Sequence, residues 1–139
     1  MNRALYWVSH LVVRLFAQIW LWRGLRGNRK LPEGACILVA NHTSFLDPPL
    51  IGTAVAREVR FVARTTLLKI PVFGAWMKAV GSVFVDRDGD PRPAIAKVGV
   101  LLSEGRVGCV FAEGSRSPDG TVQPFERGLQ LMLRRNKVP

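Results

Sequence analysis

Residues 41–47, with the sequence NHTSFLD, place a histidine and an aspartate five positions apart. Asp47 is near enough in the chain to fold back across one tight turn and accept a hydrogen bond from a ring nitrogen of His42. Such a bond fixes the tautomer and raises the basicity of the other ring nitrogen, as a general base requires. No serine or cysteine nucleophile elbow accompanies the pair, which favours direct removal of a proton from a substrate hydroxyl. The alternative is that Asp47 caps the following helix and His42 is an ordinary loop residue.

A second cluster, GSVFVDR over residues 81–87, ends an apolar run on an arginine. The guanidinium of Arg87 can bind a phosphate through two parallel hydrogen bonds. The alternative for Arg87 is a surface ion pair with an aspartate at position 86, 88 or 90.

The third cluster, FAEGSRS over residues 111–117, also follows an apolar run. Gly114 permits backbone angles that other residues avoid, and we expect Glu113 and Arg116 to face one crevice. A carboxylate that leaves a buried strand needs a partner, which either Arg116 or substrate hydroxyls could provide. Polar residues thus follow apolar runs at three places, which favours one shared site.

Short apolar runs alternate with helix-length segments along the chain, and these elements must position the three clusters. The runs predict strands over residues 35–40, 59–63, 82–85 and 107–112. Helices are predicted over residues 48–57, opened by Asp47 as the N-cap, and over 93–103 and 126–136, with a broken helix over 66–80 that contains Pro71 and Gly74. This alternation predicts an α/β layered domain with a mostly parallel sheet, in which ligands gather at the carboxyl ends of the strands.

The most apolar stretch, residues 4–22, predicts a helix that associates with a membrane. Arg14 makes a transmembrane span unfavourable, and His10, Arg14 and Gln18 share one face of the helix. Basic residues follow it at positions 23, 26, 29 and 30, as expected for attraction to anionic headgroups on the cytoplasmic face of the cell membrane. Residues 1–32 are therefore interpreted as a membrane-associating segment. The alternative is a core helix followed by a solvated basic loop.

Composition narrows the class of protein further. The chain has 139 residues, enough for one domain, and 20 Lys and Arg against 10 Asp and Glu. This surplus indicates an anionic partner: nucleic acid, an anionic membrane or a phosphorylated small molecule. Cys36 and Cys109 lie inside apolar runs, so we expect two buried, reduced thiols and no disulfide or metal site.

At the three clusters the sequence resembles the glycerolipid acyltransferase family, especially the 1-acyl-sn-glycerol-3-phosphate acyltransferases. NHTSFLDP is similar to the family block NHxSxxD, and GSVFVDR fits GxxFxxR. FAEGSRS resembles FPEGTRS, with Ala112 in place of proline and Ser115 in place of threonine. The blocks occur in the family's order, and the resemblance covers roughly residues 36–128.

The resemblance implies a glycerolphosphate-acyltransferase-like α/β fold for residues 33–139. It implies transfer of a fatty acyl group from acyl-CoA or acyl carrier protein to the hydroxyl of a lysophospholipid, most specifically 1-acyl-sn-glycerol-3-phosphate, which gives phosphatidic acid. It makes His42 the general base and Asp47 its orienting carboxylate, with neither a cofactor nor a metal. The residues that it implies for substrate binding are Arg87, Glu113, Gly114, Ser115 and Arg116.

The family pattern continues into a fourth, Val-Pro-rich strand, and this sequence ends on KVP where that strand begins. We therefore expect an incomplete sheet with an exposed apolar edge, either in a truncated form or in one whose edge a partner covers. Two other functions stay open: a non-catalytic membrane- or lipid-binding remnant of the family, and a nucleic-acid-binding domain. The second is disfavoured because the basic residues form no recognisable nucleic-acid module.

Overall fold

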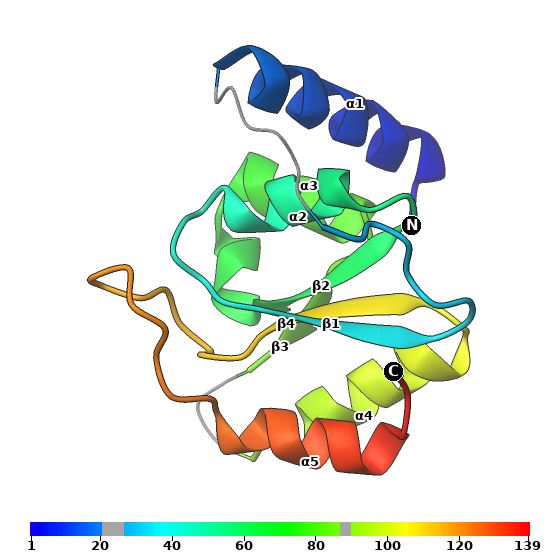
Figure 1. Ribbon diagram of the computed structural model, residues 1–139, viewed down its shortest axis with the longest axis vertical. Helices are drawn as coiled ribbons and strands as arrows, with labels where there is room; N and C mark the ends of the chain where they lie inside the picture. The colour runs from blue at the N-terminus through cyan, green and yellow to red at the C-terminus, as the bar shows by residue number, and fades with distance from the viewer. Residues whose placement is uncertain (21–26, 87–89) are drawn as a thin grey trace.

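A computed structural model describes residues 1–20, 27–86 and 90–139 as three layers, with a sheet between two groups of helices (Figure 1). The strands are β1 (Cys36–Ala40), β2 (Val59–Arg64), β3 (Val83–Val85) and β4 (Val107–Phe111). The helices are α1 (Arg3–Trp20), α2 (Asp47–Ala54), the 3-10 helix η1 (Thr65–Lys69), α3 (Pro71–Ala79), α4 (Arg92–Ser103) and α5 (Arg127–Asn136). Helices α1 to α3 lie on one side of the sheet, and α4 and α5 on the other.

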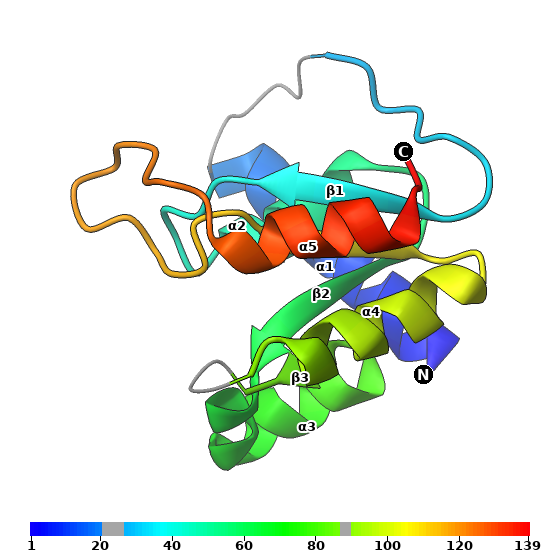
Figure 2. The ribbon, with the colours of Figure 1, turned by 90° about the horizontal axis from the view of Figure 1, so that it is seen from below.

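The sheet has the strand order β1-β4-β2-β3, and every pairing in it is parallel. The prediction of an α/β domain with a mostly parallel sheet is therefore confirmed. Apolar side chains dominate the strands because helices cover both faces. The carboxyl ends of β1 and β2 point toward the side from which the long loop after β4 projects, drawn in orange in Figure 2.

Between residues 35 and 136 the observed elements follow the predicted ones to within one residue at each end, except for α2. The broken helix is confirmed: η1 ends at Lys69, and α3 begins at Pro71. The glycine at position 74 allows η1 and α3 to pack closely, since a Cβ at that position would come within 2.8 Å of the Cα of Leu68. The prediction that Asp47 is the N-cap of α2 is wrong: Leu46 occupies that position, and α2 ends at Ala54 rather than at residue 57.

Two apolar clusters form the core, one on each face of the sheet. One contains Ile37, Ile95, Val98, Leu101, Leu102 and Met132, and the other contains Cys36, Val55, Val59, Val107 and Cys109. Both thiols are free and buried, as predicted. Burial raises the pKa of Cys109 to about 12. At the β1 edge, the Ile37 N–H donates to the carbonyl of Pro139 (2.9 Å), while the side chain of Val39 remains largely exposed.

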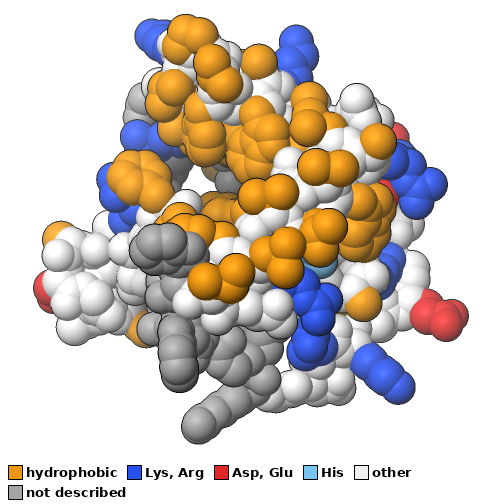
Figure 3. Space-filling view, turned by 90° about the horizontal axis from the view of Figure 1, so that it is seen from above, with side chains coloured by type: hydrophobic (Ala, Val, Ile, Leu, Met, Phe, Trp, Pro, Cys, Tyr) orange, Lys and Arg blue, Asp and Glu red, His pale blue; other side chains and the backbone are white. Residues whose placement is uncertain are grey.

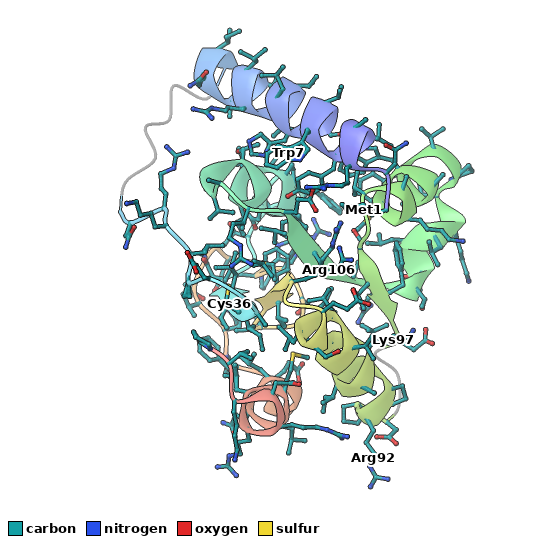
Figure 4. All side chains as sticks on the ribbon, turned by 90° about the vertical axis from the view of Figure 1, so that its right-hand side faces the viewer. Met1, Trp7, Cys36, Arg92, Lys97 and Arg106 are labelled. Carbon is teal, nitrogen blue, oxygen red and sulfur yellow. The ribbon has the colours of Figure 1, made fainter. Side chains whose placement is uncertain are left out.

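Helix α1 is fixed to the domain by polar contacts near its amino end. The hydroxyl of Tyr6 accepts a hydrogen bond from the Val59 N–H (2.9 Å), and the Trp76 indole donates to the hydroxyl of Ser9 (2.9 Å). Arg3 pairs with Glu58 at 2.9 Å. The same end of α1 is seen in Figure 4, where Met1 and Trp7 are labelled.

The opposite face of α1 turns apolar side chains outward, so α1 packs on the domain by one face only. Its exposed large apolar residues are Trp7, Val8, Leu11, Val12, Leu15, Phe16 and Ile19. Among the described residues, none of the helices combines the length and apolar character needed to cross a bilayer.

Candidate active site

The first and third clusters meet at the carboxyl edge of the sheet because β1 and β4 are neighbours. Two backbone hydrogen bonds hold their loops together: the Ala112 N–H donates to the carbonyl of Ala40 (3.0 Å), and the Ser117 N–H donates to that of His42 (2.7 Å). The structure thus brings His42 and Asp47 together with Glu113 to Arg116. Arg87, predicted for the same edge, lies outside the described residues.

His42 and Asp47 form the predicted pair, with 2.9 Å between Nδ1 and Oδ2. The same Asp47 oxygen accepts the backbone N–H groups of Thr43 and Ser44, each at 2.7 Å. The carboxylate therefore closes its own loop onto the His42 ring instead of capping α2, which excludes the capping alternative. With Asp47 accepting a proton-bearing Nδ1, the other nitrogen, Nε2, carries the free lone pair that a base needs.

The ionised form of Asp47 is favoured at this position. Burial by itself raises the pKa of Asp47, but the hydrogen bonds from the Ser44 N–H, the His42 ring and the Thr43 N–H outweigh it. The pKa of Asp47 is consequently lower than its ordinary value. A charged acceptor is thus in place to stabilise an imidazolium when His42 takes up a proton.

Phe111, the last residue of β4, fixes the plane of the His42 ring. The two rings stack with their centroids 4.0 Å apart and an interplanar angle of 21°. Phe111 belongs to the third cluster, but no role for it is predicted from the sequence. Its ring lies against the imidazole because β4 pairs with β1, and this pairing cannot be read from the sequence.

Glu113 is buried, with 4% of its surface exposed, and its Oε1 accepts the backbone N–H of His42 at 3.1 Å. From the sequence, its expected partner is Arg116 or a substrate hydroxyl. In the structure, its partner is the backbone N–H of His42. Gly114, at φ 67°, and its N–H bond to the carbonyl of Phe111 form the tight turn that follows this carboxylate. The second oxygen, Oε2, is buried and has no hydrogen-bond partner among the described residues.

Arg116 lies at the rim of the site, where its guanidinium carbon is 3.6 Å from the centroid of the Phe45 ring. This cation–π contact joins the first cluster to the third. Arg116 and its neighbour Ser115 are exposed, and among the described residues Arg116 takes part in no ion pair. Its charge is therefore available to an anionic ligand approaching His42.

The described residues contain no group of three or more His, Cys, Asp or Glu side chains placed to hold a metal ion. A hollow of about 440 Å³ lies elsewhere and is lined by Met1, Arg60, Gly81, Val83, Lys97, Val100, Leu101, Glu104 and Arg106 (Met1, Lys97 and Arg106 are labelled in Figure 4). We place the candidate site at His42 because the oriented base, its carboxylate and the buried Glu113 meet there.

Comparison with known proteins identifies the family of the chain. A profile of the acyltransferase family matches residues 24–139, so the chain belongs to that family. It is similar to the chloroplastic 1-acyl-sn-glycerol-3-phosphate acyltransferase BAT2 of Brassica napus, with 30% identity over 139 residues (94% of this chain and 40% of that protein). It is also 32% identical over 119 residues to the lyso-ornithine lipid O-acyltransferase of Brucella abortus (84% of this chain and 43% of that protein).

The crystal structure of the 1-acyl-sn-glycerophosphate (LPA) acyltransferase PlsC from Thermotoga maritima has the same fold, with a TM-score of 0.68 and 30% sequence identity. That match covers 99% of this chain and 57% of the Thermotoga chain. The chain therefore spans less than half the length of these two curated relatives and somewhat more than half of the solved structure.

Proposed function

We propose that this protein transfers a fatty acyl group from an acyl thioester, acyl-CoA or acyl carrier protein, to the free hydroxyl of a lysophospholipid. The acceptor that fits best is 1-acyl-sn-glycerol-3-phosphate, with phosphatidic acid as the product. The observation that carries this proposal is the His42–Asp47 pair, a base oriented at the sheet edge, with the cationic Arg116 over Phe45 of the same loop. The family and the solved relative support the same chemistry.

In this reaction Nε2 of His42 removes the proton from the acceptor hydroxyl while the hydroxyl oxygen attacks the thioester carbonyl. Asp47 stabilises the imidazolium that forms. The tetrahedral intermediate then collapses, the C–S bond breaks, and the imidazolium proton passes to the leaving thiolate. The products are the new ester and the free thiol, and His42 returns to its neutral form.

The remaining predicted residues bind the acceptor in this proposal. Arg116 pairs with the phosphate at the rim, and Arg87 is assigned the same task. Gly114 and Ser115 form the turn next to Glu113, where the backbone can approach the glycerol. Glu113 holds the His42 backbone through Oε1, and its buried Oε2 is assigned to a hydroxyl of the acceptor.

We further propose that the protein works on the cytoplasmic face of the cell membrane, with α1 lying in the interface. The support is the outward apolar face of α1 together with the exposed basic Arg29 and Lys30 that follow in the sequence. An interfacial helix binds through such a face, and nearby basic residues add attraction to anionic lipids.

The test is a thiol-release assay with acyl-CoA and three acceptors: lysophosphatidic acid, lysophosphatidylcholine and lyso-ornithine lipid. We expect a preference for lysophosphatidic acid, and His42→Ala should lower the rate about 10²- to 10⁴-fold. His10→Ala is the matched control because His10, the other histidine, lies on α1 and outside the candidate site. Full activity of His42→Ala would contradict the mechanism. Vesicle binding without turnover by a folded sample would favour the non-catalytic remnant.

A further inference from the structure

A second exposed apolar surface lies outside α1, at the corner where η1 meets α3. Leu68, Ile70, Val72 and Phe73 are all exposed there, and Val72 is 85% exposed, more than any other large apolar side chain described. The corner is held firmly, because Gly74 packs against the backbone of Leu67 and Leu68 and its N–H donates to the carbonyl of Ile70 (2.7 Å). These side chains are therefore presented to solvent by a fixed backbone.

This corner, which we call the η1–α3 corner (residues 68–73), lies on the same side of the molecule as α1. Helix α3 is tied to α1 by the Trp76–Ser9 hydrogen bond and by the bond from the Asn2 N–H to the carbonyl of Ala79 (2.8 Å). Seen from the α1 side, apolar side chains extend over a broad area with Lys and Arg around its rim (Figure 3). The corner and α1 thus belong to one composite face.

Basic side chains predominate among the charges on this face (Figure 3). The sequence has no acidic residue within α1 or between Val59 and Val85. Basic side chains are exposed beside the apolar ones on both elements, at Arg14 on α1 and at Lys69 and Lys78 on the η1–α3 segment. An apolar area bordered mainly by cationic side chains complements the interface of a bilayer that contains anionic lipid.

We propose that the η1–α3 corner is a second membrane-contact segment that inserts its apolar side chains together with α1. This inference rests on the membrane association proposed above and adds what α1 alone does not provide. A single interfacial helix is a narrow line of contact about which the rest of the domain can tilt, whereas a second contact away from that line restricts the tilt. Since η1 directly follows β2 at the carboxyl edge of the sheet, the fixed orientation sets how the edge that carries His42 faces the lipid.

Co-sedimentation with vesicles of phosphatidylcholine containing phosphatidylglycerol tests the proposal. Val72→Asp should weaken binding about tenfold, while Lys69→Gln should weaken binding to the anionic vesicles and leave binding to pure phosphatidylcholine unchanged. Val100→Asp is the matched control: it makes the same change at a 61% exposed valine on α4, on the other side of the sheet. If Val72→Asp and Val100→Asp bind alike while the wild-type protein binds, the inference is overturned. If the wild-type protein fails to bind, the membrane association of the proposed function fails instead.

A second measurement does not depend on introducing a charge. The native thiols Cys36 and Cys109 are buried, so a polarity-sensitive maleimide dye will label an added cysteine selectively. On addition of vesicles, dye on Val72→Cys should shift to the blue, and dye on Val100→Cys should not. Equal behaviour of the two sites overturns the proposal. A blue shift at position 72 that appears without vesicles and rises with protein concentration also overturns the proposal, because a second copy of the chain would then cover the corner.

Discussion

At the scale of single residues, the site is a set of contacts that all act on one imidazole. Asp47 holds Nδ1, Phe111 stacks on the ring, and Glu113 holds the backbone N–H. Asp47 fixes the tautomer of His42, Phe111 fixes the plane of its ring, and Glu113 fixes the position of its main chain. A base held in this way loses little entropy when it reacts, which is the main contribution that positioning makes to catalysis.

The contact from Glu113 leads to a prediction that separates positioning from substrate binding. Glu113→Ala leaves the His42 N–H without its acceptor and should cost about 1–3 kcal/mol of stability, with a fall in kcat. Glu113→Gln keeps an oxygen for that N–H, so kcat should largely recover. If Oε2 also binds the acceptor substrate, Glu113→Gln will still raise KM. Chemical unfolding and steady-state kinetics measure both effects, and equal kcat in the two variants would contradict the positioning role.

The lowered pKa of Asp47 predicts how stability varies with pH. Because the folded-state pKa lies below the unfolded one, the ionised carboxylate stabilises the fold above the unfolded value, and this contribution is lost as pH falls through the folded pKa. Asp47→Asn should therefore be less stable than the wild-type protein at pH 7, and the difference should shrink in acid. Urea unfolding at several pH values checks this, with the exposed Asp90→Asn as control. A difference that does not change with pH would contradict it.

The His42–Asp47 pair was predictable from sequence because both partners lie within one turn of chain. The contacts of Phe111 and Glu113 were not, because they depend on β4 lying next to β1. The strand order β1-β4-β2-β3 is not the order of the sequence. Apolar runs indicate that strands exist but carry no information on which of them pair. The hydrogen bond between Glu113 and the His42 N–H therefore could not be predicted from the sequence.

At the scale of elements, α1 is the part whose orientation the sequence left undecided. Its periodicity predicts an amphipathic helix but does not tell which face packs on the domain. In the structure the packed face carries Tyr6 and the partly buried His10, Val13 and Ala17, while Arg14 and Gln18 of the predicted polar stripe are exposed. Tyr6 decides this orientation, since its hydroxyl accepts the buried N–H of Val59 at the start of β2.

Removing that hydroxyl tests whether α1 is part of the folded unit. Tyr6→Phe keeps the ring but leaves the Val59 N–H buried without an acceptor, so we expect a loss of about 1–3 kcal/mol in the free energy of unfolding. Val8→Ala, at an exposed position of the same helix, is the control and should change stability little. Urea unfolding followed by circular dichroism measures both. Equal stability of the two variants would show that α1 folds independently of β2.

At the scale of the whole molecule, the proposed site depends on the integrity of β1, because this outer strand leads directly to His42. At this edge the side chain of Val39 is exposed, and the Ile37 N–H donates to the carbonyl of Pro139. Strand β1 also pairs with β4 along its whole length, and Cys36 packs in one cluster with Cys109. We therefore expect β1 to unfold together with the core and not on its own.

The two cysteines report directly on this behaviour, because one lies in the outer strand and the other in its inner neighbour. Both thiols are buried, and the pKa of Cys109 is raised to about 12, so neither should react with a maleimide at pH 7 in the native protein. As urea is increased, labelling of Cys36 and Cys109, resolved by peptide mass spectrometry, should appear at the same midpoint. The reason is that β1 has no stable state apart from β4. Labelling of Cys36 at a clearly lower urea concentration would show instead that the outer strand opens alone and that the loop carrying His42 opens with it.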